Sequence, residues 1–436
     1  MNTSKEGLKR EVGVWGLSAN ILNIIVGAGI FVLPAIIAGI MGASAVMTYL
    51  ICGFLIGLVM LCFAEAGSKV THSGGAYAYV ETAFGAYPGF LVSIFSLTGA
   101  LFADAAVSNA LIEVLGLIFP VFKDPSVRVI TLFLLFLSLA VLNVVGVKQG
   151  IGIVKINTVA KLIPLLLLVS IGWKDVQWAN LNWGASPTVK QFGETSLILF
   201  FAFIGAETGL NIGGEIKHPQ RTVPRAIFFG ISFVLVLYIL IQLVSQGVLG
   251  NDLTSFKEAP LAEVAKIAFG PVGYNLLFIG AGISMFGMLS GSILNVPRVV
   301  FRLSRDGVIP FSRLASIHCK FKTPYLAILL YAGLGFTLAS FGGFRQLAAI
   351  ASSSILVVYL GVSLSVIQLR KIKTLAADGF KIPFGYTVPI LSAGIIVYFL
   401  SNMTGLEIKG TLLFAGVITA IYFLGKIYRK WKNKAD

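Results

Sequence analysis

The stretch Ala19–Ile40, ANILNIIVGAGIFVLPAIIAGI, decides the fold of this 436-residue chain. It is apolar enough to cross a bilayer, yet Gly27 and Gly29 interrupt it and Pro34 follows. Glycine forms helices poorly and adopts backbone angles closed to other residues, and proline lacks an N–H donor. In lipid an unwound segment leaves backbone groups without partners, so it is tolerated only beside protein or a water-filled cavity. We therefore predict a spanning helix that breaks at a buried cavity.

A second apolar stretch with an interruption, LILFFAFIGAETG, occupies residues 197–209. Paired interrupted spans at corresponding places in the two halves of a chain are typical of the binding site of a secondary transporter. The alternative is that the glycines only permit close helix packing. The G-A-G sequence lacks the four-residue spacing of packing motifs and is followed by proline, which favours the break.

The composition predicts an all-α integral membrane protein. Hydrophobic residues make up 57% of the chain and charged residues only 12%, about half the charged fraction of a soluble domain. Apolar runs of about 20 residues recur, whereas the alternating pattern of an outer-membrane barrel is absent. The mixed-charge N-terminus predicts no cleaved signal peptide.

The net charge of +15 is explained by its placement, because most Lys and Arg fall in segments assigned to the inner side of the membrane. The expected partner is therefore the lipid bilayer and not a nucleic acid. We predict no disulfide, metal site or cofactor, since the three cysteines show no ligand or pairing spacing. No nucleotide-binding loop or nucleophile–base pair stands out, so no enzymatic activity is expected. The oligomeric state is left open.

Hydropathy predicts twelve transmembrane helices with both termini in the cytoplasm. Their approximate bounds are 14–40, 43–66, 84–119, 127–147, 151–173, 193–214, 222–249, 271–303, 323–341, 344–369, 385–404 and 409–429.

The first ten spans form two sets of five, each starting with an interrupted helix. Because five is odd, the second set has the opposite orientation, which gives a 5+5 inverted repeat with broken helices 1 and 6 meeting near the midplane. The expected divisions are a cytoplasmic N-terminus (1–13), a first repeat (14–173), a second, inverted repeat (193–369), helices 11 and 12 (385–429) and a cytoplasmic C-terminus (430–436).

Four motifs in the same order resemble those of the amino acid–polyamine–organocation superfamily of permeases. They are GAGIFVLP at 27–34, SGGAYAY at 73–79, FIGAE continuing into EIKHPQRTVP at 203–224, and SRDGVIP at 304–310. One departure is Thr71, where many members have proline. The resemblance covers nearly the whole chain and implies a leucine-transporter-type fold, a plasma (inner) membrane location and transport of amino acids by alternating access.

An amino acid zwitterion requires an anion site and a cation site a few ångströms apart. The helix that begins at the first break offers N–H groups and a positive dipole end to a carboxylate. The half-helix that ends at the second break offers carbonyl groups to an ammonium. The resemblance implies the same arrangement. The predicted substrate-binding residues are Ile25, Val26, Gly27, Ala28, Gly29, Ile30, Asp104, Phe201, Phe203, Ile204, Gly205, Ala206, Glu207 and Ser292.

Two ionisable residues are candidates for coupling and gating. Glu207 lies just beyond the second break, where it can carry a proton, link spans as the transporter closes, or simply hold the unwound segment together. Lys161 lies within the fifth span, where sodium-coupled relatives of the superfamily bind a cation. A fixed ammonium there would replace sodium, which implies sodium independence; the alternative is that Lys161 snorkels to the interface.

Three further positions bear on the substrate. Asp104, near the middle of the third span, either contacts a cationic substrate or pairs structurally, with Lys161 as one candidate partner. The resemblance makes Phe201 an outer gate, although simple packing is an equal alternative. Gly291-Ser292 stands where guanidinium-binding relatives have tryptophan, which weakens an arginine or agmatine assignment. On the inner side, the Glu215–His218 and Arg305–Asp306 charges form either a gate of salt bridges or topology signals.

The function predicted from the sequence is a permease for small amino acids, coupled to protons or to exchange. One alternative is a polyamine or cationic amino acid antiporter that uses Asp104 and Glu207. The other is a channel or a non-transporting membrane scaffold, but channels require a continuous polar lining that these spans lack.

Overall fold

The structure is a computed structural model that describes residues 12–71, 74–145, 151–182, 187–210, 216–305, 307–309, 311–321, 323–372 and 379–435. Its α-helices are α1 (Val14–Ile25), α2 (Gly29–Met41), α3 (Ala45–Lys69), α4 (Gly75–Phe84), α5 (Ala86–Ile118), α6 (Pro125–Val145), α7 (Ile151–Gly172), α8 (Val189–Phe200), α9 (Pro219–Leu249), α10 (Pro260–Phe269), α11 (Pro271–Asn295), α12 (Pro297–Arg305), α13 (Tyr325–Phe341), α14 (Phe344–Leu369), α15 (Thr387–Ser401) and α16 (Gly405–Ala435).

Short 3₁₀ turns join several of these helices: η1 (Gly42–Ser44), η2 (Pro120–Lys123), η3 (Trp173–Asp175), η4 (Trp178–Leu181), η5 (Phe201–Phe203), η6 (Thr208–Leu210), η8 (Gly250–Ser255) and η9 (Ser312–Ala315). The described residues contain no β-strand, and their one β-bridge joins Val12 to Ile216. The predicted all-α class is therefore confirmed for this part of the chain.

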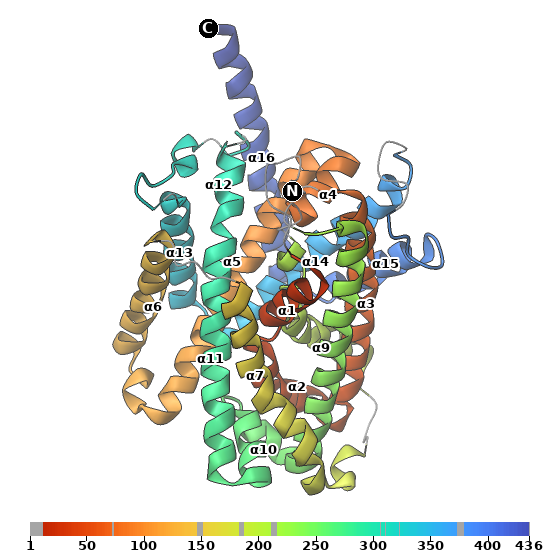
Figure 1. The fold of residues 1–436 in the computed structure, drawn as a ribbon, viewed down its shortest axis with the longest axis vertical. Coiled ribbons are helices and arrows are strands. Elements are labelled where there is room, and N and C mark those ends of the chain that lie inside the picture. Colours follow the sequence, from red (N-terminus) through yellow and green to blue (C-terminus); the bar gives the residue numbers. More distant parts are fainter. Residues whose placement is uncertain are drawn as a thin grey trace.

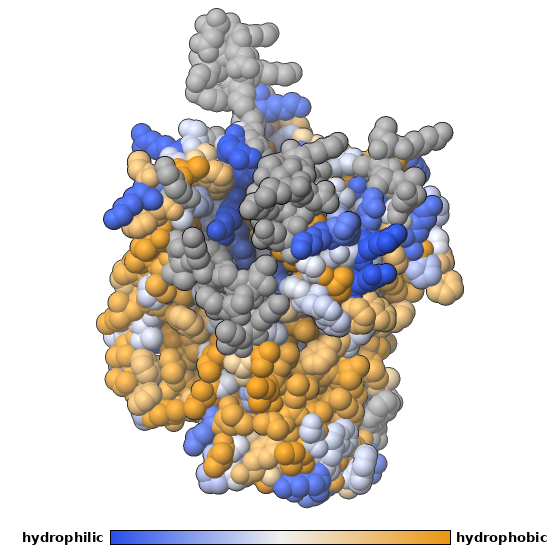
Figure 2. Space-filling view, in the orientation of Figure 1, coloured by the Kyte–Doolittle hydropathy of each residue, from blue (hydrophilic) through white to orange (hydrophobic). Residues whose placement is uncertain are grey.

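Nine helical segments of the described chain are long and apolar enough to cross a membrane. They are Gly29–Lys69, Ala86–Ile118, Pro125–Val145, Asn157–Asp175, Val189–Leu210, Pro219–Ser255, Pro271–Arg305, Phe344–Leu369 and Glu407–Lys426. Three shorter apolar helices are α1, α13 and α15. Every span predicted from the sequence overlaps one of these segments, and Gly29–Lys69 contains parts of two. Figure 2 shows a broad hydrophobic band below an end rich in hydrophilic residues, as expected for a membrane-embedded bundle.

The helices form one elongated bundle in which α5 packs most extensively against α14, and α3 against α9. Figure 1 shows α10 at one end of this bundle and α4 and α12 toward the other, with α16 extending past the remaining helices. Only a small part of α16 is buried against the rest of the chain. The core that positions the candidate site is therefore built from the helices between α1 and α14.

The first interruption lies between α1 and α2. The helix ends at Ile25, residues 26–28 form a bend, and α2 begins at Gly29. Val26 leaves helical geometry with ψ of 82°. Pro34 lies inside α2 and does not end it, so the glycine-containing segment and not the proline terminates the helix. The two helices are thus separated by a short unwound segment.

The second interruption follows α8. The 3₁₀ turn η5 ends at Phe203, and Ile204 is extended with φ −67° and ψ 143°. Gly205 has φ +113°, a conformation that L side chains rarely adopt. A Cβ atom at this position would also lie 2.4 Å from Ile24 Cγ2, so a glycine is required both by the backbone angle and by the close approach of α1. The two interruptions therefore touch each other.

A buried ionic cluster fixes the segment after α14 against α3. The carboxylate of Glu65 accepts hydrogen bonds from Arg370 Nε and Nη2 at 2.7 and 2.6 Å, from Lys69 Nζ at 3.0 Å and from the Ile382 amide at 2.9 Å. The hydrogen bonds to Glu65 raise the pKa of Arg370 above its ordinary value. Bidentate pairing of this kind holds its two partners in a defined geometry.

Candidate functional site

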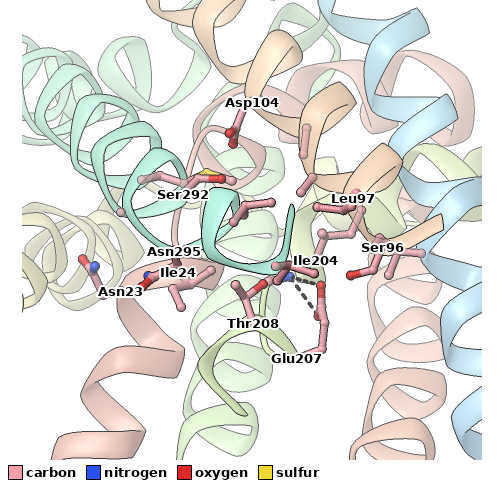
Figure 3. Close-up of a pocket in the computed structure, with 18 residues that line it drawn as sticks. Asn23, Ile24, Ser96, Leu97, Asp104, Ile204, Glu207, Thr208, Ser292 and Asn295 are labelled. Carbon is pink, nitrogen blue, oxygen red and sulfur yellow. Dashed lines mark hydrogen bonds between the residues drawn. The ribbon is translucent and has the colours of Figure 1, made fainter. Parts of the chain in front are cut away.

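A narrow cavity lies where the two interruptions meet. It encloses about 50 Å³, enough for about four water molecules. Figure 3 shows its labelled residues converging from α1, α5, α11 and the 204–208 segment. The residues that line it are Asn23, Ile24, Ser96, Leu97, Ala100, Ala103, Asp104, Ile204, Gly205, Glu207, Thr208, Met288, Gly291, Ser292, Asn295, Val296, Val299 and Ile355. Five of the residues predicted as substrate-binding, Asp104, Ile204, Gly205, Glu207 and Ser292, belong to this lining.

Glu207 joins the second interruption to α14. Its carboxylate accepts the Gly205 amide at 3.1 and 3.3 Å and the Tyr359 hydroxyl at 2.5 Å, and its side chain is buried. Figure 3 shows the Gly205 hydrogen bonds at the edge of the cavity. Hydrogen bonds to a charged group are stronger than those between neutral groups. Glu207 therefore shapes the unwound segment while it also lines the cavity.

Lys161 on α7 is connected to the first interruption. Its ammonium donates to the carbonyl oxygens of Asn23 and Val26, each at 2.9 Å, and the side chain is fully buried. It therefore does not snorkel to an interface. Ser284 on α11 donates to the same Val26 oxygen at 2.8 Å, and Tyr238 on α9 donates to Ile25 O at 3.1 Å. Carbonyl groups that unwinding would leave unpaired are thus held by three different helices.

Asp104 is held by α13 and not by Lys161. Its Oδ2 atom accepts the Tyr331 hydroxyl at 2.8 Å, and Ser292 on α11 approaches the same carboxyl group. The ion pairs of the described residues do not include an Asp104–Lys161 pair, so that possible pairing is wrong in this conformation. In Figure 3, Asp104 and Glu207 lie at opposite ends of the cluster.

The remaining residues of the first interruption are buried but lie outside the cavity lining. A Cβ atom at Gly27 would lie 2.5 Å from Met288 Sδ, and one at Gly29 would lie 2.8 Å from Ala202 Cα. Met288, which does line the cavity, therefore covers Gly27, and the second interruption packs directly on Gly29. The neighbouring Ala28 and Ile30 are fully buried.

The aromatic residues of the second interruption pack away from the cavity. Phe201 makes an edge-to-face contact with Phe344, with ring centroids 5.4 Å apart, and Phe203 packs against Tyr238 at 5.4 Å. Neither residue, nor Ala206, belongs to the lining. In this conformation the structure thus has Phe201 in a packing contact, and the gate assignment for it stays a prediction.

Several polar lining residues were not predicted. Asn23 accepts a hydrogen bond from Asn157 Nδ2 at 3.0 Å, and Ser96, Thr208 and Asn295 also line the cavity. The sequence could have indicated Asn23 and Asn295, because a side-chain amide inside an apolar span is energetically costly unless it has hydrogen-bond partners. It gave no such signal for the small residues of α5 beside Asp104.

Other predicted features fall partly outside the described residues. Glu215 and Asp306 lie outside them, so the predicted inner gate of salt bridges also falls outside the described residues. Arg305 is described and lies over the Phe301 ring at 5.8 Å. Among the described residues no group of three His, Cys, Asp or Glu side chains could hold a metal ion.

Gly291 keeps part of the cavity open, and this gives a testable prediction. A Cβ atom there would meet no atom within 4 Å, so Gly291→Leu is expected to fill the cavity without disrupting α11. We expect about a tenfold to hundredfold loss of ligand affinity, matching the roughly 1–3 kcal/mol cost of overpacking. Gly282→Leu is the matched control, since Gly282 lies on the same helix, is equally unhindered and is not part of the lining. Equal ligand affinity in both variants would contradict the assignment of the cavity.

The apolar helices, the two touching interruptions and the buried polar groups around them define a multi-pass integral membrane protein with an internal, partly polar cavity. The chain belongs to the amino acid permease family, whose model matches residues 12–422. The resemblance noted in the sequence is thereby confirmed, and the family is one of membrane transporters and not of enzymes.

Three bacterial relatives match nearly the whole chain. The serine/threonine exchanger SteT of Bacillus subtilis is 28% identical over 412 residues, covering 90% of both chains. The methylthioribose transporter of the same organism is 27% identical over 460 residues, and its branched-chain amino acid permease BcaP is 25% identical over 440 residues. Each of these two alignments covers 97% of this chain and 94% of the relative. Amino acid transport is the function that these similarities support.

Proposed function

We propose that this protein is a secondary-active transporter that moves small amino acids across the plasma membrane by alternating access. The observation that carries the proposal is a pair of unsatisfied helix ends at the two interruptions. Among the described residues, the amides of Ala28, Gly29 and Ile30 and the carbonyl oxygens of Ala202 and Phe203 have no hydrogen-bond partner. These groups are buried, and buried backbone groups are rarely left unpaired.

The chemistry of these two ends fits a zwitterion. Three amides at the start of α2, at its positive dipole end, suit a carboxylate. Two carbonyl groups at the end of the α8–η5 segment suit an ammonium. Because Gly29 packs on Ala202, the two ends are adjacent. We therefore assign the α-carboxylate of the substrate to the first interruption and the α-ammonium to the second.

The relatives narrow the substrate only to a class. Two of them are named for amino acids, which fits the helix ends, whereas the methylthioribose transporter shows that a match along the whole chain does not by itself select the ligand. The narrow cavity and the covering Met288 favour a small side chain. Serine, threonine and the branched-chain amino acids are accordingly the first substrates to test.

We infer that transport is independent of sodium. The Lys161 ammonium already bonds two carbonyl oxygens of the first interruption, and oxygen atoms of this kind are the ligands that hard cations require. Substrate transport is then coupled either to the movement of a proton carried by Glu207 or to exchange for a second amino acid. Glu207 is suited to the proton because it contacts both the unwound segment and α14.

The membrane topology that we propose has twelve spans and both termini in the cytoplasm. The twelve predicted spans coincide with apolar helices, and each interrupted helix begins a set of five, which supports an inverted repeat of 14–173 and 193–369 followed by two further helices at 385–429. Cysteine accessibility at Cys319, which is exposed in the structure, tests this topology: a membrane-impermeant thiol reagent should label it only from the cytoplasmic side.

The experiment that tests the function is uptake into proteoliposomes containing the purified protein. A panel of labelled serine, threonine, leucine, arginine and putrescine is measured without sodium, with and without a pH gradient and with and without internal amino acid. The proposal predicts saturable uptake of small neutral amino acids. Non-saturable flux would indicate a channel, and no flux under any condition would indicate a scaffold.

A second candidate function, transport of cationic amino acids or polyamines, is favoured by one observation, the carboxyl group of Asp104 in the cavity wall. Because Asp104 already accepts the Tyr331 hydroxyl, we expect Asp104→Asn to change the KM for neutral amino acids less than about threefold, the loss of about one neutral hydrogen bond. A loss of cationic uptake by about tenfold or more in Asp104→Asn would instead establish the second function. The wild-type protein is the reference for both measurements, the KM for neutral amino acids and the rate of cationic uptake.

A further inference from the structure

We propose that a groove between α3 and α9 binds one anionic phospholipid, with an acyl chain between the helices and the headgroup at Arg221 and Arg225. The groove encloses about 870 Å³ and lies outside the cavity that we assign to the substrate. Its walls come from two helices that pack extensively against each other and lie side by side in Figure 1. The proposal is independent of what the protein transports.

The long part of the groove is apolar. Leu50, Phe54 and Leu61 on α3 face Phe228 and Leu235 on α9 across it, and Phe54 and Phe228 are more than half exposed. From Arg225 to Ile239, which both line the groove, α9 rises by about 21 Å. One leaflet of hydrocarbon is about 15 Å thick, so the groove is long enough to hold the chain of a lipid from that leaflet.

The groove exists because α3 presents a small surface to it. Gly53 and Gly57 are four residues apart and both line the groove. Glycines at this spacing usually allow another helix to pack closely, and Leu235 does approach Gly53. A Cβ atom at Gly57, however, would meet nothing within 4 Å. The helices therefore diverge at Gly57 and leave a space that an acyl chain fits.

One end of the groove is positively charged. Arg221 and Arg225 line it, are exposed, and have no ion-pair partner among the described residues. They are four residues apart on one helix face, an arrangement in which like charges repel each other. None of the described residues that line the groove is acidic. A phosphate between the two guanidinium groups would remove the repulsion and form charge-assisted hydrogen bonds.

Two neighbouring features indicate that the charged end of the groove lies at the depth of the lipid headgroups. Trp15 is 73% exposed and stacks on Phe229, another lining residue, with ring centroids 5.5 Å apart. Tryptophan is enriched at membrane–water interfaces. Phe380 closes this end of the groove, and it belongs to the segment that Glu65 and Arg370 fix against α3. The groove thus has a fixed wall, an interfacial aromatic residue and two cationic groups at one end.

The test is native mass spectrometry of the full-length protein in detergent, titrated with phosphatidylglycerol or phosphatidylcholine. The wild type is expected to retain one phosphatidylglycerol about tenfold more tightly than phosphatidylcholine, since each basic residue near an anionic lipid contributes appreciably to binding. Arg221→Gln with Arg225→Gln should remove this preference. The matched control is Arg313→Gln with Lys320→Gln, two exposed basic residues that do not line the groove, and it should keep the preference.

Gly57→Leu distinguishes lipid binding inside the groove from nonspecific electrostatic attraction of anionic lipid to the protein. The side chain would occupy the space of the acyl chain, so binding of both lipids should fall about tenfold while the arginines remain. Equal retention of the two lipids by the wild type, or the same preference in the Arg221/Arg225 variant, would overturn the proposal. A dimer in the spectrum that Gly57→Leu dissociates would also overturn it, because a second copy of the chain would then be the occupant.

Discussion

Replacing Lys161 with methionine is expected to abolish sodium-independent uptake. The substitution keeps the length and apolar stem of the side chain but removes the donor shared by Asn23 O and Val26 O. An unsatisfied buried polar group costs about 1–3 kcal/mol, and although Ser284 still bonds Val26 O, Asn23 O loses this donor. We expect the first interruption to rearrange and uptake to fall by about a hundredfold, near the upper end of that range. The measurement is the initial uptake rate in proteoliposomes, normalised to the amount of correctly inserted protein.

Two controls make the Lys161 result interpretable. Lys190→Met removes a lysine whose side chain is 82% exposed, and its uptake should match the wild type. Ser284→Ala removes the other donor to Val26 O and should give an intermediate loss. If Lys161→Met kept more than half of the wild-type rate, the ammonium would not be required and the inference of sodium independence from Lys161 would fail.

The second large effect is expected for Glu207→Gln. Glutamine keeps the shape of the side chain and can accept the Gly205 amide, but it cannot carry a charge or release a proton. Loss of charge-assisted hydrogen bonds corresponds to about 1.5–3 kcal/mol, so we expect uptake to fall by about tenfold to a hundredfold. If Glu207 is the proton carrier, any remaining uptake should also no longer respond to a pH gradient. The measurement is uptake at several gradients.

Tyr359→Phe is the matched control for Glu207. It removes one hydrogen bond to the carboxylate but leaves the titratable group and the Gly205 contact in place. We expect a modest loss of uptake with the gradient response retained. A Glu207→Gln protein with wild-type uptake and a wild-type gradient response would show that the glutamate only holds the unwound segment.

The helical breaks could be predicted because their causes are local. Gly27 and Gly29 lie within an apolar run, and Gly205 occupies a positive-φ position, so the residue type itself carries the signal. The same reasoning applied to Lys161, because a lysine far from the ends of an apolar span requires a partner. Its partners are the backbone carbonyl groups of Asn23 and Val26 at the first interruption.

The details of the cavity could not be predicted, because they depend on how each helix is rotated and which neighbour it meets. Tyr331 is 227 residues from Asp104, and Tyr359 is 152 residues from Glu207. Nothing in the local sequence indicates either pairing. Met288 covers Gly27 for the same reason.

Packing also sets where the aromatic residues lie in this conformation, and the gate role of Phe201 stays a prediction. Phe201 was a candidate gate by resemblance, yet its ring contacts Phe344 outside the cavity lining. In a chain with 33 phenylalanines, aromatic identity alone does not separate a gate from a core residue. The position of the ring relative to the cavity separates them, and that position is set by the geometry of η5.

The central claim is that the two interrupted helices hold opposite poles of a zwitterion, and binding calorimetry tests it most directly. For the amino acid with the highest uptake, the purified protein is titrated with that amino acid, with the amine that lacks its carboxylate and with the acid that lacks its ammonium. We predict measurable binding of the amino acid and about a hundredfold or weaker binding of each analogue, since either one leaves a helix end unpaired. Binding of the amine or the acid with the affinity of the amino acid would contradict the claim.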